Sequence, residues 1–180
     1  MKLSAKIICY HLQKSFSIHT SRLDTFPTLS CPSCFEKSMP LQDGRVYLIT
    51  DPDFQPTFHH PKNILFLMIG KAYQNYELSQ PNMCIIPEDL PVNTVFNKLQ
   101  DIFILYDQWN QSLMDSRLRN ASIQELLDLT TSIIPNPMML IGMDFTIIAS
   151  RGWDLGDLSN SVLGSSENSW DIVDSLKQDP

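Results

Sequence analysis

Residues 64–70 read Ile-Leu-Phe-Leu-Met-Ile-Gly, and this stretch decides the fold. Its six apolar residues show no alternation with polar ones, and the run is too short for a buried helix. A strand without alternation is covered on both faces, as in the middle of a sheet flanked by other layers. We therefore predict a central strand over residues 64–70.

Apolar runs on either side predict two more strands. Residues 46–50 and 83–86 are each bounded by Pro, Gly, Asp or Asn, which favour turns. Residues 4–16 place apolar side chains at near-helical spacing and predict an amphipathic first helix. Residues 20–44 show neither period and predict a loop with at most a short strand or helical turn. Residues 1–92 are therefore expected to form an α/β (α+β) domain with a mixed sheet.

After residue 92 the apolar residues recur at alternating spacings of four and three, which predicts one long helix over residues 94–117 within a connector, residues 93–120. The apolar stripe consists of Val95, Leu99, Ile102, Tyr106, Trp109 and Leu113. Two interpretations stay open: the stripe packs on its own sheet, or part of it pairs with a second copy of the chain. Under the second interpretation, the predicted contacts of a homodimer are Tyr106, Trp109 and Leu113.

A second domain is expected over residues 121–180. The sequence Ser122-Ile123-Gln124-Glu125 is a capping-box pattern and predicts a helix to about Thr131, with an apolar side turned inward. The inward residues are expected to include Ile123, Leu126, Leu127 and Ile133. Residues 138–141 and 145–149 then predict a β-hairpin. A lone hairpin is not stable by itself, so we expect this domain to be incomplete and the chain to be a fragment.

Composition and charge narrow the classes of function. The chain has 180 residues, of which 43% are hydrophobic and 18% charged, and its net charge is −7, all of it contributed by residues 93–180. Neither half offers the basic surface that nucleic-acid binding requires, so we expect no DNA binding by this chain alone. No apolar run approaches the roughly 20 residues of a membrane span, and His11, Gln13 and Lys14 interrupt the N-terminal apolar residues. A cytoplasmic location without membrane contact is expected.

Cys31 and Cys34 form a Cys-x-x-Cys pair, which is typical of redox dithiols and of half a zinc site. The surrounding loop favours a third interpretation, cysteines without a chemical role. His59 and His60 are adjacent, and neighbouring residues seldom bind one metal together, so solvated loop histidines are the better interpretation. We expect no enzyme, cofactor or metal. A small cytoplasmic enzyme or metal-binding domain using Cys31 and Cys34 is the alternative.

Residues 93–149 resemble the upstream region of purine-catabolism-regulator-like (PucR-like) transcription factors of anaerobic bacteria. The resemblance is carried by Thr94-Val95-Phe96, Phe103, Tyr106-Asp107-Gln108-Trp109, Leu113, Ile123-Gln124-Glu125-Leu126-Leu127-Asp128-Leu129, Asn136-Pro137 and Asp144-Phe145-Thr146-Ile147-Ile148-Ala149. It implies a sensory or assembly domain, a signalling connector helix, and the start of a GAF/PAS-like domain from Pro137. It also implies an unknown small-molecule effector, and DNA binding only through a C-terminal helix-turn-helix that this chain does not contain.

Overall fold

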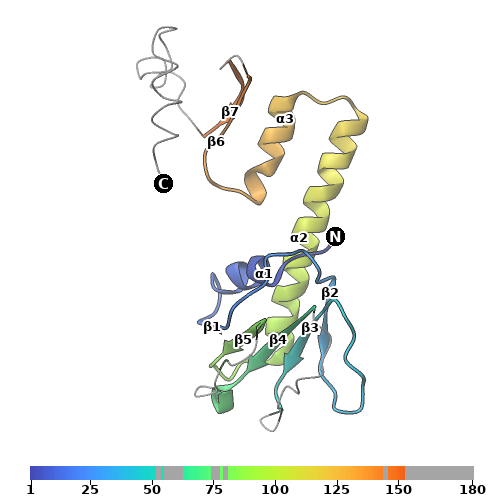
Figure 1. Cartoon of the computed structure of the whole chain (residues 1–180), viewed down its shortest axis with the longest axis vertical. Coiled ribbons are helices and arrows are strands. Elements are labelled where there is room, and N and C mark those ends of the chain that lie inside the picture. The colour runs from blue at the N-terminus through green and yellow to red at the C-terminus, as the bar shows by residue number, and fades with distance from the viewer. Residues whose placement is uncertain (52–53, 55–62, 74–77, 79–80, 144–145, 153–180) are drawn as a thin grey trace. The chain divides into compact units, whose positions relative to one another are not determined.

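The computed structural model describes residues 1–51, 54, 63–73, 78, 81–143 and 146–152 (Figure 1). Packing divides the chain into two compact units, unit 1 (Met1–Gln108) and unit 2 (Trp109–Pro180). The boundary falls inside one helix, α2 (Val92–Leu118). Three predicted parts of the chain lie outside the described residues: the loop histidines, the start of the second hairpin segment, and half of the expected second domain.

Unit 1 contains a five-stranded mixed sheet with the strand order β1-β5-β4-β3-β2. Its strands are β1 (His19–Thr20), β2 (Cys31–Cys34), β3 (Arg45–Ile49), β4 (Ile64–Ile69) and β5 (Met83–Ile86). β2 to β5 run parallel, whereas β1 pairs antiparallel with β5. β4 is the middle strand and all six of its residues are buried, which confirms the predicted central strand.

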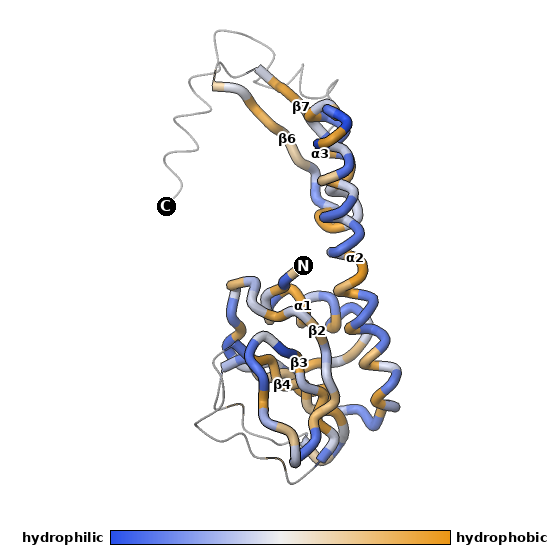
Figure 2. Tube along the Cα trace, turned by 90° about the vertical axis from the view of Figure 1, so that its right-hand side faces the viewer, coloured by the Kyte–Doolittle hydropathy of each residue, from blue (hydrophilic) through white to orange (hydrophobic). Residues whose placement is uncertain are grey.

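The two faces of the sheet are covered differently. One face carries an aromatic and aliphatic core cluster that includes Tyr47, Phe66 and Met83, which are neighbours in the strand register. The opposite face carries Cys84, whose thiol hydrogen-bonds to Cys9 of helix α1 (Ala5–Leu12). The part of helix α2 that belongs to unit 1 lies along one face of the sheet in both orientations shown (Figures 1 and 2).

The predicted first helix is confirmed as α1, with Ser4 as its N-cap. The Ser4 hydroxyl accepts a hydrogen bond from the Ile7 amide at 3.2 Å, which satisfies one of the free donors of the first turn. Residues 20–44 contain the end of β1 and one short strand, β2, as the prediction of a loop with at most a short strand allows. β2 contains Pro32, which lacks an amide hydrogen and is tolerated because β2 is an edge strand.

The long predicted helix is confirmed as α2. Hydrophobic and polar positions alternate along its length (Figure 2). Within unit 1, the stripe residues Val95, Leu99, Ile102 and Tyr106 are all buried. This part of the stripe therefore belongs to the core of its own chain.

Unit 2 continues with α3 (Ile123–Asp128), a 3-10 turn η2 (Leu129–Ser132) and the antiparallel strands β6 (Met138–Ile141) and β7 (Ile147–Arg151). The predicted capping box is confirmed: the Ser122 amide donates to Glu125 Oε2 at 2.7 Å and the Glu125 amide donates to Ser122 Oγ at 3.2 Å. The predicted hairpin is also confirmed. None of the described helices is long and apolar enough to cross a membrane.

The Gln124 side chain ties α3 to β7. Its Nε2 donates to the Ser150 carbonyl at 2.9 Å, and its Oε1 accepts from the Ser150 amide at 3.1 Å. Arg151 Nη2 donates to the carbonyls of Ile134 and Asn136 at 2.6 and 2.8 Å. These contacts fix the hairpin against the segment that precedes it.

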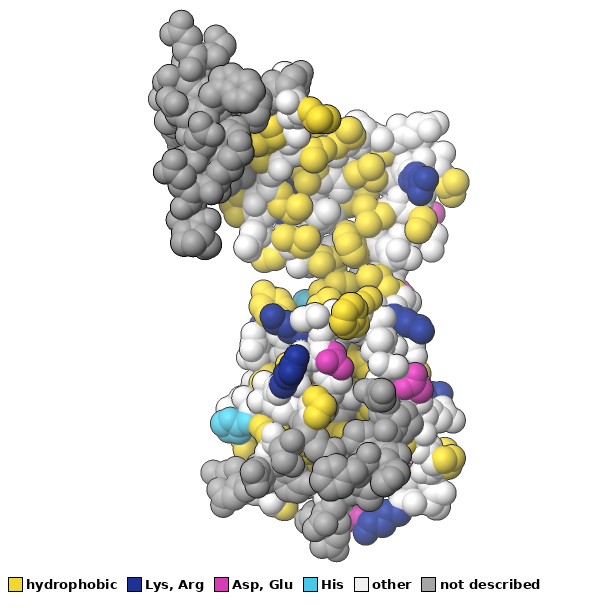
Figure 3. Space-filling view, in the orientation of Figure 1, with side chains coloured by type: hydrophobic (Ala, Val, Ile, Leu, Met, Phe, Trp, Pro, Cys, Tyr) yellow, Lys and Arg dark blue, Asp and Glu magenta, His cyan; other side chains and the backbone are white. Residues whose placement is uncertain are grey.

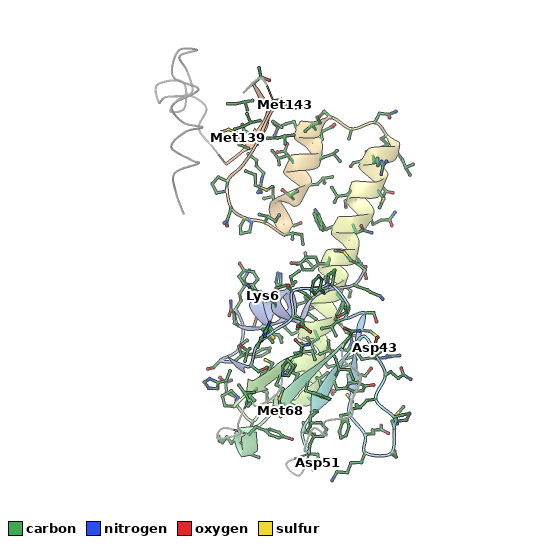
Figure 4. The ribbon with its side chains drawn as sticks, in the orientation of Figure 1. Lys6, Asp43, Asp51, Met68, Met139 and Met143 are labelled. Carbon is green, nitrogen blue, oxygen red and sulfur yellow. The ribbon has the colours of Figure 1, made fainter. Side chains whose placement is uncertain are left out.

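Apolar side chains of unit 2 lie largely at its surface. Ile123, predicted to face inward, has 48% of its surface exposed, and this part of the prediction was wrong. Among the described apolar residues of this unit, only Ala149 is fully buried. Apolar side chains gather on the face shown in Figure 3, and Met139 and Met143 can be located on the hairpin in Figure 4. The spacing of apolar residues predicts which side of α3 is apolar. In the described part of the chain, however, no other residues pack over Ile123 closely enough to bury it.

Candidate functional site

The Cys-x-x-Cys pair lies on a strand rather than in a loop. Cys31 and Cys34 are the first and last residues of β2, so an odd number of positions separates them and their side chains leave opposite faces of the sheet. Three residues of extended chain span about 10 Å between Cα atoms, beyond the roughly 7 Å limit for a disulfide. In this conformation the two thiols can neither pair with each other nor converge on one metal ion.

Arg45 is the residue that the strand pairing brings to Cys31. The two residues are partners in the register of β2 and β3, and Arg45 Nη1 donates to Cys31 Sγ at 3.1 Å and to Ser33 Oγ at 3.1 Å. Ser33 lies on the same face of β2 as Cys31. The sequence analysis had not identified Arg45, because the contact depends on which strand β2 pairs with.

Beside this cluster lies a pocket of about 130 Å³, which we call the Arg45 pocket. Its walls include Ser33, Phe35, Glu36, Gln42, Arg45 and Tyr47. The Tyr47 hydroxyl accepts a hydrogen bond from the Gln42 amide at 2.8 Å, and the ring of Phe35 meets that of Tyr47 edge to face at 6.5 Å. Arg45 is half-buried and makes no ion pair with any carboxylate in the described part of the chain.

Cys9 and Cys84 form a separate, buried thiol pair. The hydrogen bond with Cys9, which favours the protonated Cys84 thiol, and then burial raise the pKa of Cys84 well above its ordinary value. A thiol held protonated inside the core is a poor nucleophile. Across the described ranges, no three His, Cys, Asp or Glu side chains are grouped so that they could hold a metal ion.

Tyr106, the first predicted dimer contact, is buried in unit 1. Its hydroxyl lies 3.1 Å from His11 Nε2, and the two rings meet edge to face. Burial raises the pKa of Tyr106, with a smaller contribution from Tyr10. Burial lowers the pKa of His11, with smaller contributions from Lys14 and Lys98. The pair is a neutral hydrogen-bonded contact between α1 and α2.

The other two predicted contacts, Trp109 and Leu113, belong to unit 2 and are half-buried there. Two more apolar residues of the same helical segment are open to solvent, Met114 at 50% and Leu118 at 82% exposure. The predicted seam is therefore divided between the two units. The apolar side chains of this helix that remain accessible to solvent near the seam lie in residues 109–118.

A second hollow, of about 360 Å³, lies within unit 2 where α2 gives way to α3. Ser116, Arg119, Glu125 and Asp128 contribute polar groups to its walls. Hydrogen bonds from the Ser122 backbone, then from its hydroxyl, lower the pKa of Glu125, with a smaller contribution from Arg119. Glu125 is thus committed to capping α3.

No known protein family matches the chain, and neither the curated proteins nor the solved structures contain a significant match.

Proposed function

We propose that this chain is the ligand-sensing and oligomerisation region of a PucR-like bacterial transcriptional regulator in the cytoplasm. Unit 1 is then the sensory or assembly domain, α2 the connector, and unit 2 the beginning of a GAF/PAS-like domain. DNA binding belongs to a C-terminal domain outside this chain. The observation that carries the proposal is the single helix α2, which forms part of the unit 1 core and continues without a break into unit 2.

A continuous helix suits a signalling connector for a mechanical reason. Every interior turn is held by backbone hydrogen bonds, so the helix moves as a stiff rod rather than as a flexible linker. Val95, Leu99 and Ile102 anchor its first half among buried side chains. A change in the packing of unit 1 would then displace residues beyond Gln108. Coupling between sites would require α2 to adopt two such positions.

Self-association through the second half of α2 is part of the proposal, with a second copy of the chain as the partner. Trp109, Leu113, Met114 and Leu118 supply apolar surface there. Residues 109–118 contain one acid and one base, Asp115 and Arg117, although residues 93–180 together carry the whole charge of −7. Pairing at this segment therefore avoids the like-charge repulsion that the rest of the acidic half would impose.

A reporter fusion tests the connector role. The chain is fused to a DNA-binding domain that recognises its operator only as a dimer, and repression of a reporter gene is measured. We expect repression by the wild type and by Asn110→Ala, but not by Asn110→Pro, because proline inside a helix removes a hydrogen bond and costs about 3 kcal/mol. Equal repression by the proline and alanine variants would contradict the proposal.

The alternative of a small enzyme using Cys31 and Cys34 has less support. The two thiols leave opposite faces of β2, so neither a dithiol exchange nor a shared metal follows from their spacing. Labelling the purified protein with a thiol reagent and measuring its zinc content would test this alternative. Rapid joint reaction of Cys31 and Cys34, or stoichiometric zinc, would favour it over the regulator.

A further inference from the structure

We propose that the Arg45 pocket binds a small organic carboxylate, with the carboxylate held by the Arg45 guanidinium and the Ser33 hydroxyl. The binding itself is independent of the regulator role. Naming this ligand as the effector of the chain is the step that rests on the proposed function.

The guanidinium is the main argument for an anion. Arg45 is always charged and presents five N–H donors in a planar fork, of which Nη1 serves Cys31 Sγ and Ser33 Oγ. No carboxylate in the described part of unit 1 pairs with it. Partly removing a charge from water without a counter-charge is unfavourable, and a bound carboxylate would supply two acceptor oxygens that match the fork.

The remaining walls restrict the body of the ligand. Phe35, Met39, Pro40 and Tyr47 add apolar side chains to the lining of the pocket, beside its polar groups. A volume of about 130 Å³ is well below the 300 Å³ or more of sites for drug-sized ligands. The ligand is therefore compact and has an apolar part of a few carbon atoms.

Glu36 bears on which anion fits the pocket. This exposed glutamate also lines the pocket, so a bound anion meets one positive and one negative side chain. A dianion such as sulfate or phosphate would be attracted more strongly by Arg45 and repelled more strongly by Glu36, so its second charge gives it no clear advantage. It would also leave the apolar part of the lining without a contact. A monocarboxylate with an apolar part fills both the polar and the apolar lining.

The test is an NMR titration of the whole chain with defined probes. Propionate and isobutyrate are the carboxylates, propionamide and isobutyramide are neutral molecules of the same shape, and sulfate is a bare dianion. We expect isobutyrate to shift and saturate the backbone amides of β2 and of residues 35–47, with a Kd on the order of a few millimolar, as suits a ligand with so few atoms. The amides and sulfate should bind at least about tenfold more weakly, since they lack either the charge or the fit.

Three variants locate the site. Arg45→Gln should raise the Kd for isobutyrate at least about tenfold, because the charged partner of the carboxylate is lost, and Ser33→Ala about threefold, because one hydroxyl donor is lost. Arg22→Gln is the matched control, because Arg22 is exposed and is not among the residues lining this pocket, and it should bind like the wild type. If Arg45→Gln does not fold, the Kd of Ser33→Ala for isobutyrate tests the proposal instead.

Three results would overturn the proposal: carboxylates and their amides binding alike, sulfate binding as tightly as isobutyrate, or shifts that fall outside residues 31–47. None of them would affect the reporter test of α2, so failure of this site and failure of the regulator role are separable.

Discussion

His11 Nε2 and the Tyr106 hydroxyl lie 3.1 Å apart and join the first helix of unit 1 to the long helix. The contact keeps Tyr106 inside its own chain, where the heptad spacing alone had allowed a place in a dimer seam. It also makes the stability of unit 1 depend on the protonation of a histidine.

We predict that unit 1 loses stability as the pH falls below about 6.5. The folded protein lowers the pKa of His11 from that ordinary value, chiefly through burial, so near pH 6.5 the unfolded chain binds more protons than the folded chain. The free energy of unfolding must then rise with pH through this window and level off above it. Denaturant unfolding followed between pH 5 and 8 measures this dependence.

His11→Gln is the control for this pH effect, because glutamine keeps a polar side chain but does not titrate. The variant should show a flatter dependence of unfolding free energy on pH than the wild type. Equal slopes for the two proteins would show that other groups cause the effect.

The central strand gives a second prediction. Leu67 is fully buried in the middle of β4, so Leu67→Asp would bury a charge without a partner and should destabilise unit 1 by several kcal/mol. Phe26→Asp adds the same charge at an exposed apolar residue of the same unit and should change stability by less than about 1 kcal/mol. Thermal unfolding of both variants provides the comparison, and an unchanged melting temperature for Leu67→Asp would refute the core assignment.

Elements whose structure depends on local contacts or on complete burial could be predicted from the sequence. β4 was recognisable because a strand covered on both faces needs no polar residues, and α2 because its buried residues keep a regular spacing of four and three. The capping box was readable because Ser122 and Glu125 interact within one turn. In each case the deciding contacts are local or the burial is complete.

Features that depend on distant partners could not be predicted. Pro32 and Ser33 have little intrinsic strand preference, and β2 exists because it pairs with residues 14 positions further along the chain. The contact of Arg45 with Cys31 follows from that pairing. The spacing of residues in the sequence therefore gives no indication of the Arg45 pocket. The exposure of Ile123 was missed for a related reason: an amphipathic pattern shows which side of a helix is apolar, not what covers it.

The third prediction concerns nucleic acid. The chain alone should not bind duplex DNA at physiological salt, because its net charge of −7 would be brought close to the phosphates without a basic surface to displace their counterions. A mobility-shift titration at several salt concentrations measures this. A shift that weakens as salt rises would contradict the prediction and would point to a local basic surface.

The final prediction separates the two halves of the apolar stripe on α2. Wild-type chain should sediment as a dimer at tens of micromolar, a concentration range suited to a weak interface (about 10⁻⁵ M). Trp109→Ala removes a large, half-buried ring from residues 109–118 and should shift the chain toward monomer while its circular dichroism spectrum stays that of the wild type.

Tyr106→Ala is the contrasting variant. Tyr106 is buried against His11, so its truncation should destabilise unit 1 by about 3 kcal/mol or more, as expected when a large aromatic side chain is removed from a core. Sedimentation and denaturant unfolding are measured on the same samples of both variants. A wild-type monomer at this concentration, or a Trp109→Ala chain that unfolds like Tyr106→Ala, would show that both halves of the stripe are intramolecular core. A monomeric but folded Trp109→Ala chain would place the contact between copies after Gln108.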